Sequence, residues 1–532
     1  MSDAAMGSHS SSVHMQSKPT GTALIILLLV LALGIGYALR GLITDITSAG
    51  TPPLAIGAFV LLGVALLIAL GFEFVNGFHD TANAVATVIY TRSLAPTAAV
   101  ILSGSLNLLG VLWSSGTVAF GIISLLPVEL ILHVGTGAGY AMIFSLLIAA
   151  IIWNLGTWWR GLPASSSHTL VGSIIGVGLA NQLLAGRSGV SGVDWSQAGK
   201  VFEALIFSPL VGFALSGLLL LLLKFLIRIP ALYKAPEGNA PPPLWIRAIL
   251  VLTCSSVSFA HGSNDGQKGM GLIMLILIGV VPTAFALNHA MPASATPGFI
   301  AATTQAEMVF QAHVGGAPIP NATAARAALE TAVEKRALQG GASWAALDAI
   351  AADIADQVQT HGSMGSIPAA AVSNVRNDMY LTAQTLKLGG AALTGTEKTN
   401  VAAYSKLLTR STQFIPPWVK VAVAIALGLG TMVGWKRIVV TVGEKIGKTH
   451  LTYGQGAAAE IVAAITIMAA DRFGLPVSTT HILSSGIAGT MAANGSGLQW
   501  DTVRDIALAW VLTLPCAMLL SGVLFAILRS VL

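Results

Sequence analysis

The sequence predicts an all-α, polytopic membrane protein built from two repeated halves. Of its 532 residues, 54% are hydrophobic and only 9% are charged, whereas soluble domains carry about 25% charged residues. The apolar residues gather in runs of about 20, which is the length that crosses a bilayer as a helix. Two short motifs from the first half of the chain recur in the second half. A soluble globular fold is excluded, because it could not bury so much apolar surface.

The apolar runs predict about 10 to 12 transmembrane segments, several of them short or interrupted by Gly and Pro. They lie near residues 22–43, 54–76, 97–115, 139–159, 165–185, 202–227, 247–261, 267–288, 417–435, 455–471, 476–493 and 503–530. The first run is too long for a signal peptide, so we expect it to be a membrane helix. The predicted organisation is a disordered tail (1–20), a first transmembrane half (21–227), a basic loop (228–247), the start of the second half (248–288), a polar insert (289–414) and the remainder of the second half (415–532).

The insert is polar, rich in Ala and mixed in charge, which predicts a soluble group of small helices. The short loops 228–247 and 436–448 are basic, and basic short loops are typical of the cytoplasmic side. Two crossings are expected to separate these loops, one a broken helix over 249–287 and the other a helix over 419–435. The insert lies between the two crossings and is therefore predicted to face the outside.

The net charge of +5 does not indicate a nucleic-acid partner. Nucleic-acid binding requires a basic patch or stripe, whereas these Lys and Arg residues gather in short loops. Cys254 and Cys516 both lie in apolar runs. They are interpreted as packed thiols rather than as a disulfide.

The first repeated motif centres on an aspartate. It reads N-G-F-H-D-T-A-N at residues 76–83 and A-H-G-S-N-D-G-Q-K at residues 260–268. The two copies align on Asp80 and Asp265, each with a Gly three residues earlier. An ionisable side chain within a membrane span is costly and marks a functional site. A purely structural ion pair, such as Asp265 with Lys268, is the alternative, but duplication of the whole set favours function.

The second repeated motif carries hydroxyl groups. It reads G-L-P-x-S-[ST]-[ST]-H at residues 161–168 and again at residues 474–481. The aspartate-to-histidine interval is 88 residues in the first half and 216 in the second, and the excess is close to the length of the insert. The halves therefore share one layout. Matching Gly/Pro-interrupted segments in two halves indicate the binding site of a transporter, with helices broken at the motifs.

A helix that starts beside the Pro would present hydroxyls and free N–H groups to an oxyanion. The alternative is that the hydroxyls only help helices to pack in lipid. The glycines either let the backbone approach a ligand or only allow close packing. The expected substrate- and ion-binding residues are His79, Asp80, Thr81, Asn83, Ser165, Ser166, Ser167, Asn264, Asp265, Lys268, Ser478, Thr479 and Thr480. The expected supporting residues are Glu73, Asn76, Gly77, His168, Gly262, Gln267 and His481, with the two histidines either binding the ligand or orienting the hydroxyls.

At these motifs the sequence resembles the PiT family of inorganic phosphate transporters, specifically the bacterial Pit type of low-affinity phosphate/proton symporter. The resemblance covers both halves. It implies inverted-topology repeats with inorganic phosphate bound between them, alternating access, and a multi-pass location in the inner (plasma) membrane. It also implies that phosphate enters as a neutral complex with a divalent metal. No resident cofactor or metal site is expected, and the oligomeric state is open and includes a homodimer.

The sequence departs from the sodium-coupled members, whose repeats typically read N-D-x-x-N. Here one Asn position holds His79 and another holds Lys268. Lys has no acceptor and cannot ligate sodium, whereas His titrates near neutral pH and can move a proton. Protons are therefore the expected coupling ion.

Three other functions compete with proton-coupled phosphate import. A sodium-coupled phosphate or sulfate symporter shares the architecture. An intramembrane serine hydrolase would use Ser165–Ser167 with His168, but neighbouring helical residues point in different directions and make a poor dyad. A receptor or channel is the third, although paired charges within the spans suit alternating access better than an open pore. The protein is not expected to be an enzyme.

Overall fold

The computed structural model describes residues 21–51, 54–126, 131, 136–184, 193–236, 240–390 and 392–531. The predicted tail, residues 1–20, lies outside the described residues. Within those ranges the regular structure is helical, apart from an isolated antiparallel bridge between Gly447 and Leu498. The predicted all-α class is confirmed.

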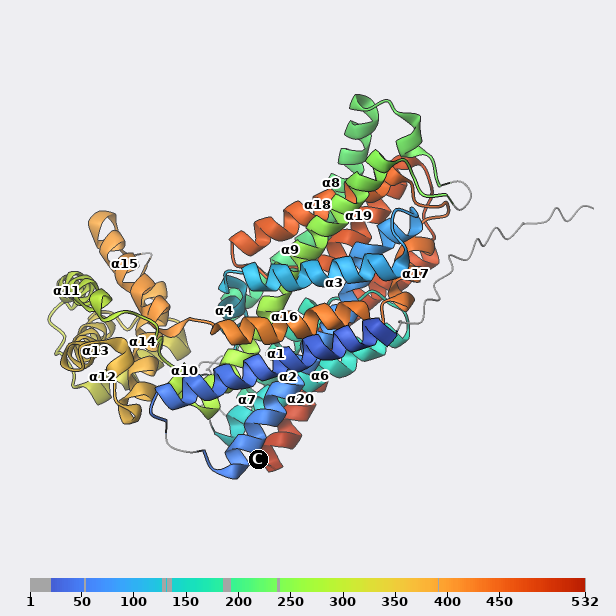
Figure 1. The fold of residues 1–532 in the computed structure, drawn as a ribbon. Helices are drawn as coiled ribbons and strands as arrows, with labels where there is room; N and C mark the ends of the chain where they lie inside the picture. Colours follow the sequence, from blue (N-terminus) through green and yellow to red (C-terminus); the bar gives the residue numbers. More distant parts are fainter. Residues whose placement is uncertain are drawn as a thin grey trace, which may run out of the picture.

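Long helices lie side by side in a bundle, and a group of shorter helices lies at one end of it (Figure 1). The bundle helices are α1 (Gly21–Ser48), α2 (Ile56–Tyr90), α3 (Pro96–Trp113), α4 (Thr117–Ile123), α6 (Gly137–Trp159), α7 (Ser166–Leu184), α8 (Trp195–Leu226), α9 (Leu244–Val280), α16 (Pro417–Met432), α17 (Lys436–Glu444), α18 (Tyr453–Arg472), α19 (Thr479–Asn494) and α20 (Trp500–Val531). The shorter helices are α10 (Pro282–Phe285), α11 (Thr296–His313), α12 (Ala322–Lys335), α13 (Gly341–Thr360), α14 (Ala369–Gly389) and α15 (Gly395–Thr412). The short 3₁₀ turns are η1 (Pro230–Tyr233), η2 (Ala293–Ala295) and η3 (Met364–Ser366).

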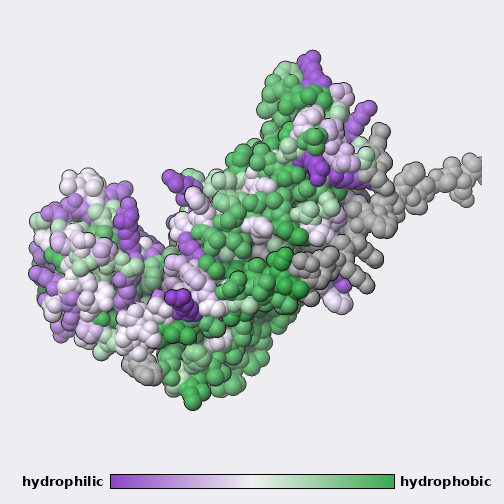
Figure 2. Space-filling view, in the orientation of Figure 1, coloured by the Kyte–Doolittle hydropathy of each residue, from purple (hydrophilic) through white to green (hydrophobic). Residues whose placement is uncertain are grey.

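The bundle has the surface of a membrane protein. Figure 2 shows apolar residues gathered over the bundle and polar residues over α11–α15 and over the opposite end. Among the described residues, eight helices are long and apolar enough to cross a membrane, or nine if α15 and α16, which meet at 70°, count as one broken span. The eight are in α1, α2, α3, α6, α8, α9, α18 and α20. The chain is therefore a multi-pass membrane protein.

Two of the predicted segments, 247–261 and 267–288, do not exist as separate helices. They belong to α9, a continuous helix of 37 residues. The aspartate motif of the first half likewise lies inside α2, a continuous helix of 35 residues. The expectation that helices break at the aspartate motifs is therefore wrong. Polar side chains in these stretches have partners on other helices, so the backbone hydrogen bonds of α2 and α9 remain intact. The expected interruption occurs at the hydroxyl motifs, where α7 and α19 begin.

Helices α2 and α9 run in opposite directions. The end of α2, around Tyr90, shares one apolar cluster with the start of α9, around Leu250. The start of α2, around Leu62, shares another cluster with the end of α9, around Ile276. The two aspartate motifs therefore lie on antiparallel helices.

Each half packs a helix against the other half. Helix α3 follows α2 and packs on α9, while α16 follows the insert and packs on α2. Glycines allow backbone contact at equivalent points. A Cβ at Gly77 would lie 2.3 Å from Leu427 O, and a Cβ at Gly262 would lie 2.1 Å from Asn107 O. Of the two readings of these glycines, the structure supports close helix packing.

The helices that follow the hydroxyl motifs are exchanged in the same way. Helix α8 packs on α19, and α20 packs on α7. A Cβ at Gly176 would lie 2.1 Å from Met518 O, and a Cβ at Gly489 would lie 2.0 Å from Phe213 O. Helices α7 and α19 are thus held by matching contacts.

Candidate functional site

The hydroxyl motifs form two equivalent helix starts. The chain turns at Gly161 and Gly474, whose φ angles of +67° and +66° favour glycine. The first hydroxyl of each motif then caps its helix. Ser165 Oγ accepts from the His168 N–H at 3.2 Å, and Ser478 Oγ accepts from the His481 N–H at 3.1 Å. Such caps satisfy one of the free N–H groups at a helix start, and they leave the next two hydroxyls of each motif for other contacts.

The two helix starts face one another. The rings of His168 and His481 lie 4.4 Å apart, and His481 stacks on Trp510 of α20 at 4.1 Å. Both N-termini carry partial positive charge, which favours an anion between them. His168 Nδ1 and His481 Nε2 are buried and make no hydrogen bond to any described group. Each can therefore offer a nitrogen to a ligand.

Asp80 joins α2 to both helix starts. Its carboxylate accepts from Ser166 Oγ at 2.8 Å and from Thr480 Oγ1 at 2.5 Å. His79 Nδ1 lies 3.3 Å from the same carboxylate, and His79 Nε2 lies 3.1 Å from Thr157 Oγ1 of α6. All of these groups are buried. One aspartate thus contacts a hydroxyl from each half of the chain.

Asp265 has a different partner, although it occupies the equivalent place. Lys268 Nζ lies 2.6 Å from Asp265 Oδ2 and donates to Ser167 Oγ at 2.5 Å. Lys268 is fully buried. The structural ion pair considered from the sequence therefore exists, and the same ammonium also contacts a hydroxyl of the first half.

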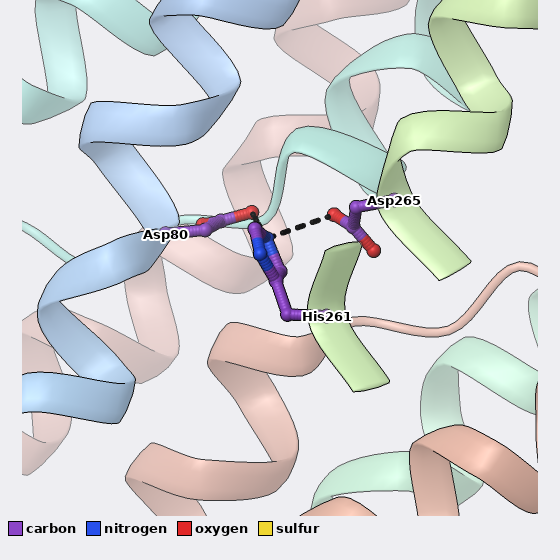
Figure 3. A group of neighbouring side chains, drawn as sticks. All are labelled: Asp80, His261 and Asp265. Carbon is purple, nitrogen blue, oxygen red and sulfur yellow. Dashed lines mark ion pairs between the residues drawn. The ribbon is translucent and has the colours of Figure 1, made fainter. Parts of the chain in front are cut away.

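A histidine lies between the two aspartates, as Figure 3 shows. His261 Nε2 is 3.6 Å from Asp265 Oδ2 and 3.9 Å from Asp80 Oδ2. Its other nitrogen lies 2.8 Å from Asn107 Oδ1 of α3, which fixes the orientation of the ring. One ligand atom from each of Asp80, His261 and Asp265 lies within 4.8 Å of the others, an arrangement that could hold a metal ion.

Several buried polar atoms around this point lack hydrogen-bond partners among the described residues. They are Asp265 Oδ1, Thr479 Oγ1, His261 Nε2 and Asn264 Oδ1, whereas Asp265 Oδ2 has its ion pair with Lys268. Buried polar groups are almost always hydrogen-bonded. Such a concentration of unpaired donors and acceptors marks the place where a polar ligand would bind.

The remaining predicted residues lie at varying distances from this centre. Asn264 Nδ2 donates to Leu475 O at 3.2 Å, beside the second hydroxyl motif. Gln267 instead faces α18 and α4, because its amide donates to Asp471 at 2.5 Å and accepts from the Val118 N–H at 2.9 Å. Asn76 and Glu73 lie along α2, and Asn76 Oδ1 accepts from Ser166 Oγ at 2.7 Å. The side chains of Thr81 and Asn83 lie outside the described residues.

Three polar residues of this region were not predicted from the sequence. His261 precedes Asp265 by one helical turn within a quoted motif, and that spacing could have indicated it. Glu460 is an acidic residue in the middle of the apolar run of α18, which marks it as unusual. Its carboxylate accepts from the hydroxyls of Thr87 on α2 and Thr253 on α9. Asn107 gave no signal in the sequence, since only the fold places it beside His261.

The hydroxyls do not form a serine-histidine dyad. Ser165 Oγ accepts from a backbone N–H, Ser166 Oγ donates to either Asn76 or Asp80, and Ser167 Oγ donates to Val477 O at 2.8 Å. The described geometry therefore offers binding contacts rather than an activated nucleophile.

Several known proteins are similar to this chain. Residues 76–521 match the model of the phosphate transporter family. The chain is 42% identical over 497 residues to the low-affinity inorganic phosphate transporter PitB of Escherichia coli, covering 89% of this chain and 98% of that protein. It is also 42% identical over 493 residues to PitA of the same organism, covering 88% and 96% of the two chains. A solved structure titled "The sodium-dependent phosphate transporter" is 20% identical, with a TM-score of 0.49 over 89% of this chain and 100% of that one.

Proposed function

The chain belongs to the phosphate transporter family, and we propose that it imports inorganic phosphate across a bacterial inner membrane together with protons. The observation that carries the proposal is the pair of facing helix starts with their hydroxyls and unpaired polar atoms. The names of the similar proteins give the substrate, and the geometry is suited to it. No catalytic residue is assigned, because the protein is a transporter and not an enzyme.

Phosphate is proposed to sit between the starts of α7 and α19. Ser166, Ser167, Thr479 and Thr480 provide hydroxyls there, and the two helix N-termini provide positive charge. Thr479 Oγ1 has no hydrogen-bond partner among the described residues and is free to donate. Lys268 already donates to Ser167, so its ammonium would lie beside the bound anion as a fixed positive charge.

A divalent cation carried with the phosphate is proposed to bind Asp80, His261 and Asp265. Carboxylate oxygens and an imidazole nitrogen suit Mg²⁺, Mn²⁺ and Zn²⁺ to different degrees. The three ligand atoms lie close together, and His261 Nε2 and Asp265 Oδ1 make no hydrogen bond to any described group. The cation would be cargo rather than a resident metal, since Lys268 pairs with Asp265 in its place.

Protons rather than sodium are proposed to drive the uptake. The support is that His79 and Lys268 replace oxygen-bearing side chains at the two motif positions, and both are buried beside the aspartates. A fixed ammonium repels a sodium ion in its immediate surroundings. A sodium-coupled phosphate or sulfate symporter is the alternative.

Alternating access is proposed to follow from inverted repeats. The support is the antiparallel course of α2 and α9 together with the exchanged helices and their matching glycine contacts. A site between two such halves can open to either side of the membrane when the halves rock against each other.

Radiolabelled phosphate uptake into proteoliposomes tests the function. We expect an inward proton gradient to drive uptake at constant sodium, and a sodium gradient at constant pH to have no effect. Unlabelled phosphate and arsenate should compete, whereas sulfate should not. Uptake of sulfate but not phosphate would reject the substrate assignment, and uptake that requires sodium would reject proton coupling alone.

A further inference from the structure

Two carboxyl groups on membrane-spanning helices are fully buried, lie outside the proposed phosphate and cation positions, and form no ion pair with any described side chain. They are Glu73 on α2 and Glu460 on α18. Glu460 is satisfied, because each of its oxygens accepts from a threonine hydroxyl. Glu73 is held more weakly: Oε2 accepts a long bond of 3.4 Å from Asn76 Nδ2, and its further hydrogen-bonding neighbour is the backbone of Gly269.

Glu73 is connected to the proposed site through two side chains. Asn76 donates to Glu73 and accepts from Ser166 Oγ at 2.7 Å, and Ser166 Oγ also lies 2.8 Å from Asp80 Oδ2. A hydroxyl has a single proton, so Ser166 can donate to Asn76, to Asp80 or to a bound anion, but to only one at a time. If Ser166 donates its proton to bound phosphate, Asn76 loses that hydrogen bond, and Asn76 in turn contacts Glu73.

The place of Glu73 along the bundle suits exchange with one side of the membrane. It precedes Asp80 by two turns of α2, about 10 Å along the axis. That direction leads to the start of α2, which shares an apolar cluster with the end of α9 next to the insert. Its carboxyl group lies against Gly269 of α9, where an added Cβ would be 2.5 Å from Oε1. The charged groups that face it from α9 are Lys268 and Asp265.

We propose that Glu73 carries the proton that is transported with phosphate. The inference rests on the proposed function and adds to it the residue that couples the two fluxes. Glu73 takes up one proton when the site is open on the insert side and releases that proton when the site is open on the other side. His79, the proton carrier expected from the sequence, has both ring nitrogens engaged, by Asp80 and Thr157, and acts as a positioning residue for Asp80.

The physical basis of the coupling is the cost of placing two anions near each other in a buried site. An ionised carboxyl without a cation partner is expensive inside a membrane protein, whereas the protonated form is not. Two unit charges about 10 Å apart at an effective dielectric of 20 disfavour each other by roughly tenfold in affinity. Phosphate therefore binds best when Glu73 holds its proton, and by reciprocity bound phosphate favours the proton on Glu73.

The substitution Glu73→Gln separates exchange from net transport. Gln is shaped like a protonated Glu and cannot release a proton. In proteoliposomes loaded with unlabelled phosphate, the variant should exchange labelled phosphate within about threefold of the unmodified protein, because exchange needs no proton release. Net uptake driven by a proton gradient should fall to the level of empty liposomes. Glu397→Gln, a half-exposed residue of α15 that faces His313 within the insert, is the matched control and should change neither flux.

Three outcomes would overturn the proposal. In the first, Glu73→Gln retains accumulation of phosphate driven by the proton gradient. In the second, the variant loses both exchange and net uptake although it is incorporated into the liposomes in normal amount. Alternatively, Glu460→Gln could be the variant that exchanges without accumulating. If Glu73→Gln does not fold, Glu73→Asp is measured instead. The pH of half-maximal net uptake by this variant should shift, and an unchanged value would reject Glu73 as the proton carrier. Absence of phosphate exchange in the unmodified protein would instead reject the proposed function itself.

Discussion

At the scale of single residues, the two aspartates occupy equivalent places but have different partners. Asp80 receives hydroxyl groups from both halves of the chain, whereas Asp265 pairs with Lys268. His261 lies between them and contacts neither at hydrogen-bond distance. The site is therefore asymmetric in charge although its backbone contacts are symmetric. The two aspartates are therefore tested by separate substitutions.

Asp80→Asn and Asp265→Asn are each expected to abolish phosphate uptake while the protein still reaches the membrane. An Asn at 265 would leave Lys268 buried without its counter-ion, and breaking a buried pair in this way costs about 3–5 kcal/mol. That energy corresponds to a loss of more than about 100-fold in any step that needs the pair. Initial uptake rates, normalised to the amount of protein in the membrane by immunoblot, measure the effect. Near-normal uptake by both variants would reject the site.

The double change His79→Asn with Lys268→Asn is expected to weaken the proton dependence of uptake and to allow some sodium dependence. A charged Lys268 would repel a sodium ion at 4 Å by about 4 kcal/mol at an effective dielectric of 20, which is nearly a thousandfold in affinity. Removing the ammonium removes that repulsion. Uptake by the variant is compared under separate sodium and proton gradients. An unmodified protein that already needs sodium would contradict the reasoning, though not the phosphate assignment.

Much of the site was visible in the sequence because it is duplicated. Asp80, Ser166, Ser167, Thr480 and Lys268 were all indicated by repeated motifs, and the structure brings them together. Asn107 could not be found in this way, because its role depends on which helix α3 packs against. Gln267 shares a motif with Asp265 but faces α18, since neighbouring helical residues point to different sides.

At the scale of helices, close packing at glycines explains how polar motifs can lie inside unbroken spans. Gly77 and Gly262 let α16 and α3 approach α2 and α9 at the level of the aspartates. Small residues at such contacts replace the hydrophobic driving force that helices lack in lipid. Hydropathy located most of the helices correctly, but it could not show that the two segments around Asp265 form one helix, because the polar motif lowers the apolar signal in the middle of α9.

Gly77→Ala and Gly262→Ala are expected to destabilise the protein, whereas Gly71→Ala is not. A Cβ at Gly77 or Gly262 would collide with a carbonyl oxygen of the facing helix, and a Cβ at Gly71 has no neighbouring atom within 4 Å. Overpacking of this kind costs about 1–3 kcal/mol, whereas Gly to Ala in an open helical position gains up to about 1 kcal/mol. Thermal unfolding of the detergent-solubilised protein measures the difference. Equal melting temperatures for the three variants would contradict the packing contacts.

At the scale of the whole molecule, the insert and the basic loops lie at opposite ends of the bundle (Figure 1). Helix α9 begins after the loop that contains Pro230–Tyr233 and ends next to the insert, and α16 returns from the insert to α17. The packing of α8 on α19 and of α20 on α7, each across the two halves, could not be predicted from the sequence. Hydropathy carries no information on which helices pack together. The opposite placement of loop and insert could be predicted, since it follows from the number of crossings.

The insert is therefore expected to face the outside of the cell, and labelling of single cysteines tests this. The background variant replaces Cys254 and Cys516 by Ala, and the test position is Gln339→Cys, an exposed residue beside Gly340. The basic loops should lie in the cytoplasm, because Lys and Arg near span ends are retained there. A membrane-impermeant maleimide should then label Gln339→Cys in intact cells and should label Lys448→Cys, exposed near the end of α17, only after lysis. The reverse pattern would invert the topology and would place Glu73 on the cytoplasmic side of Asp80, so that the direction of proton entry would be reversed with it.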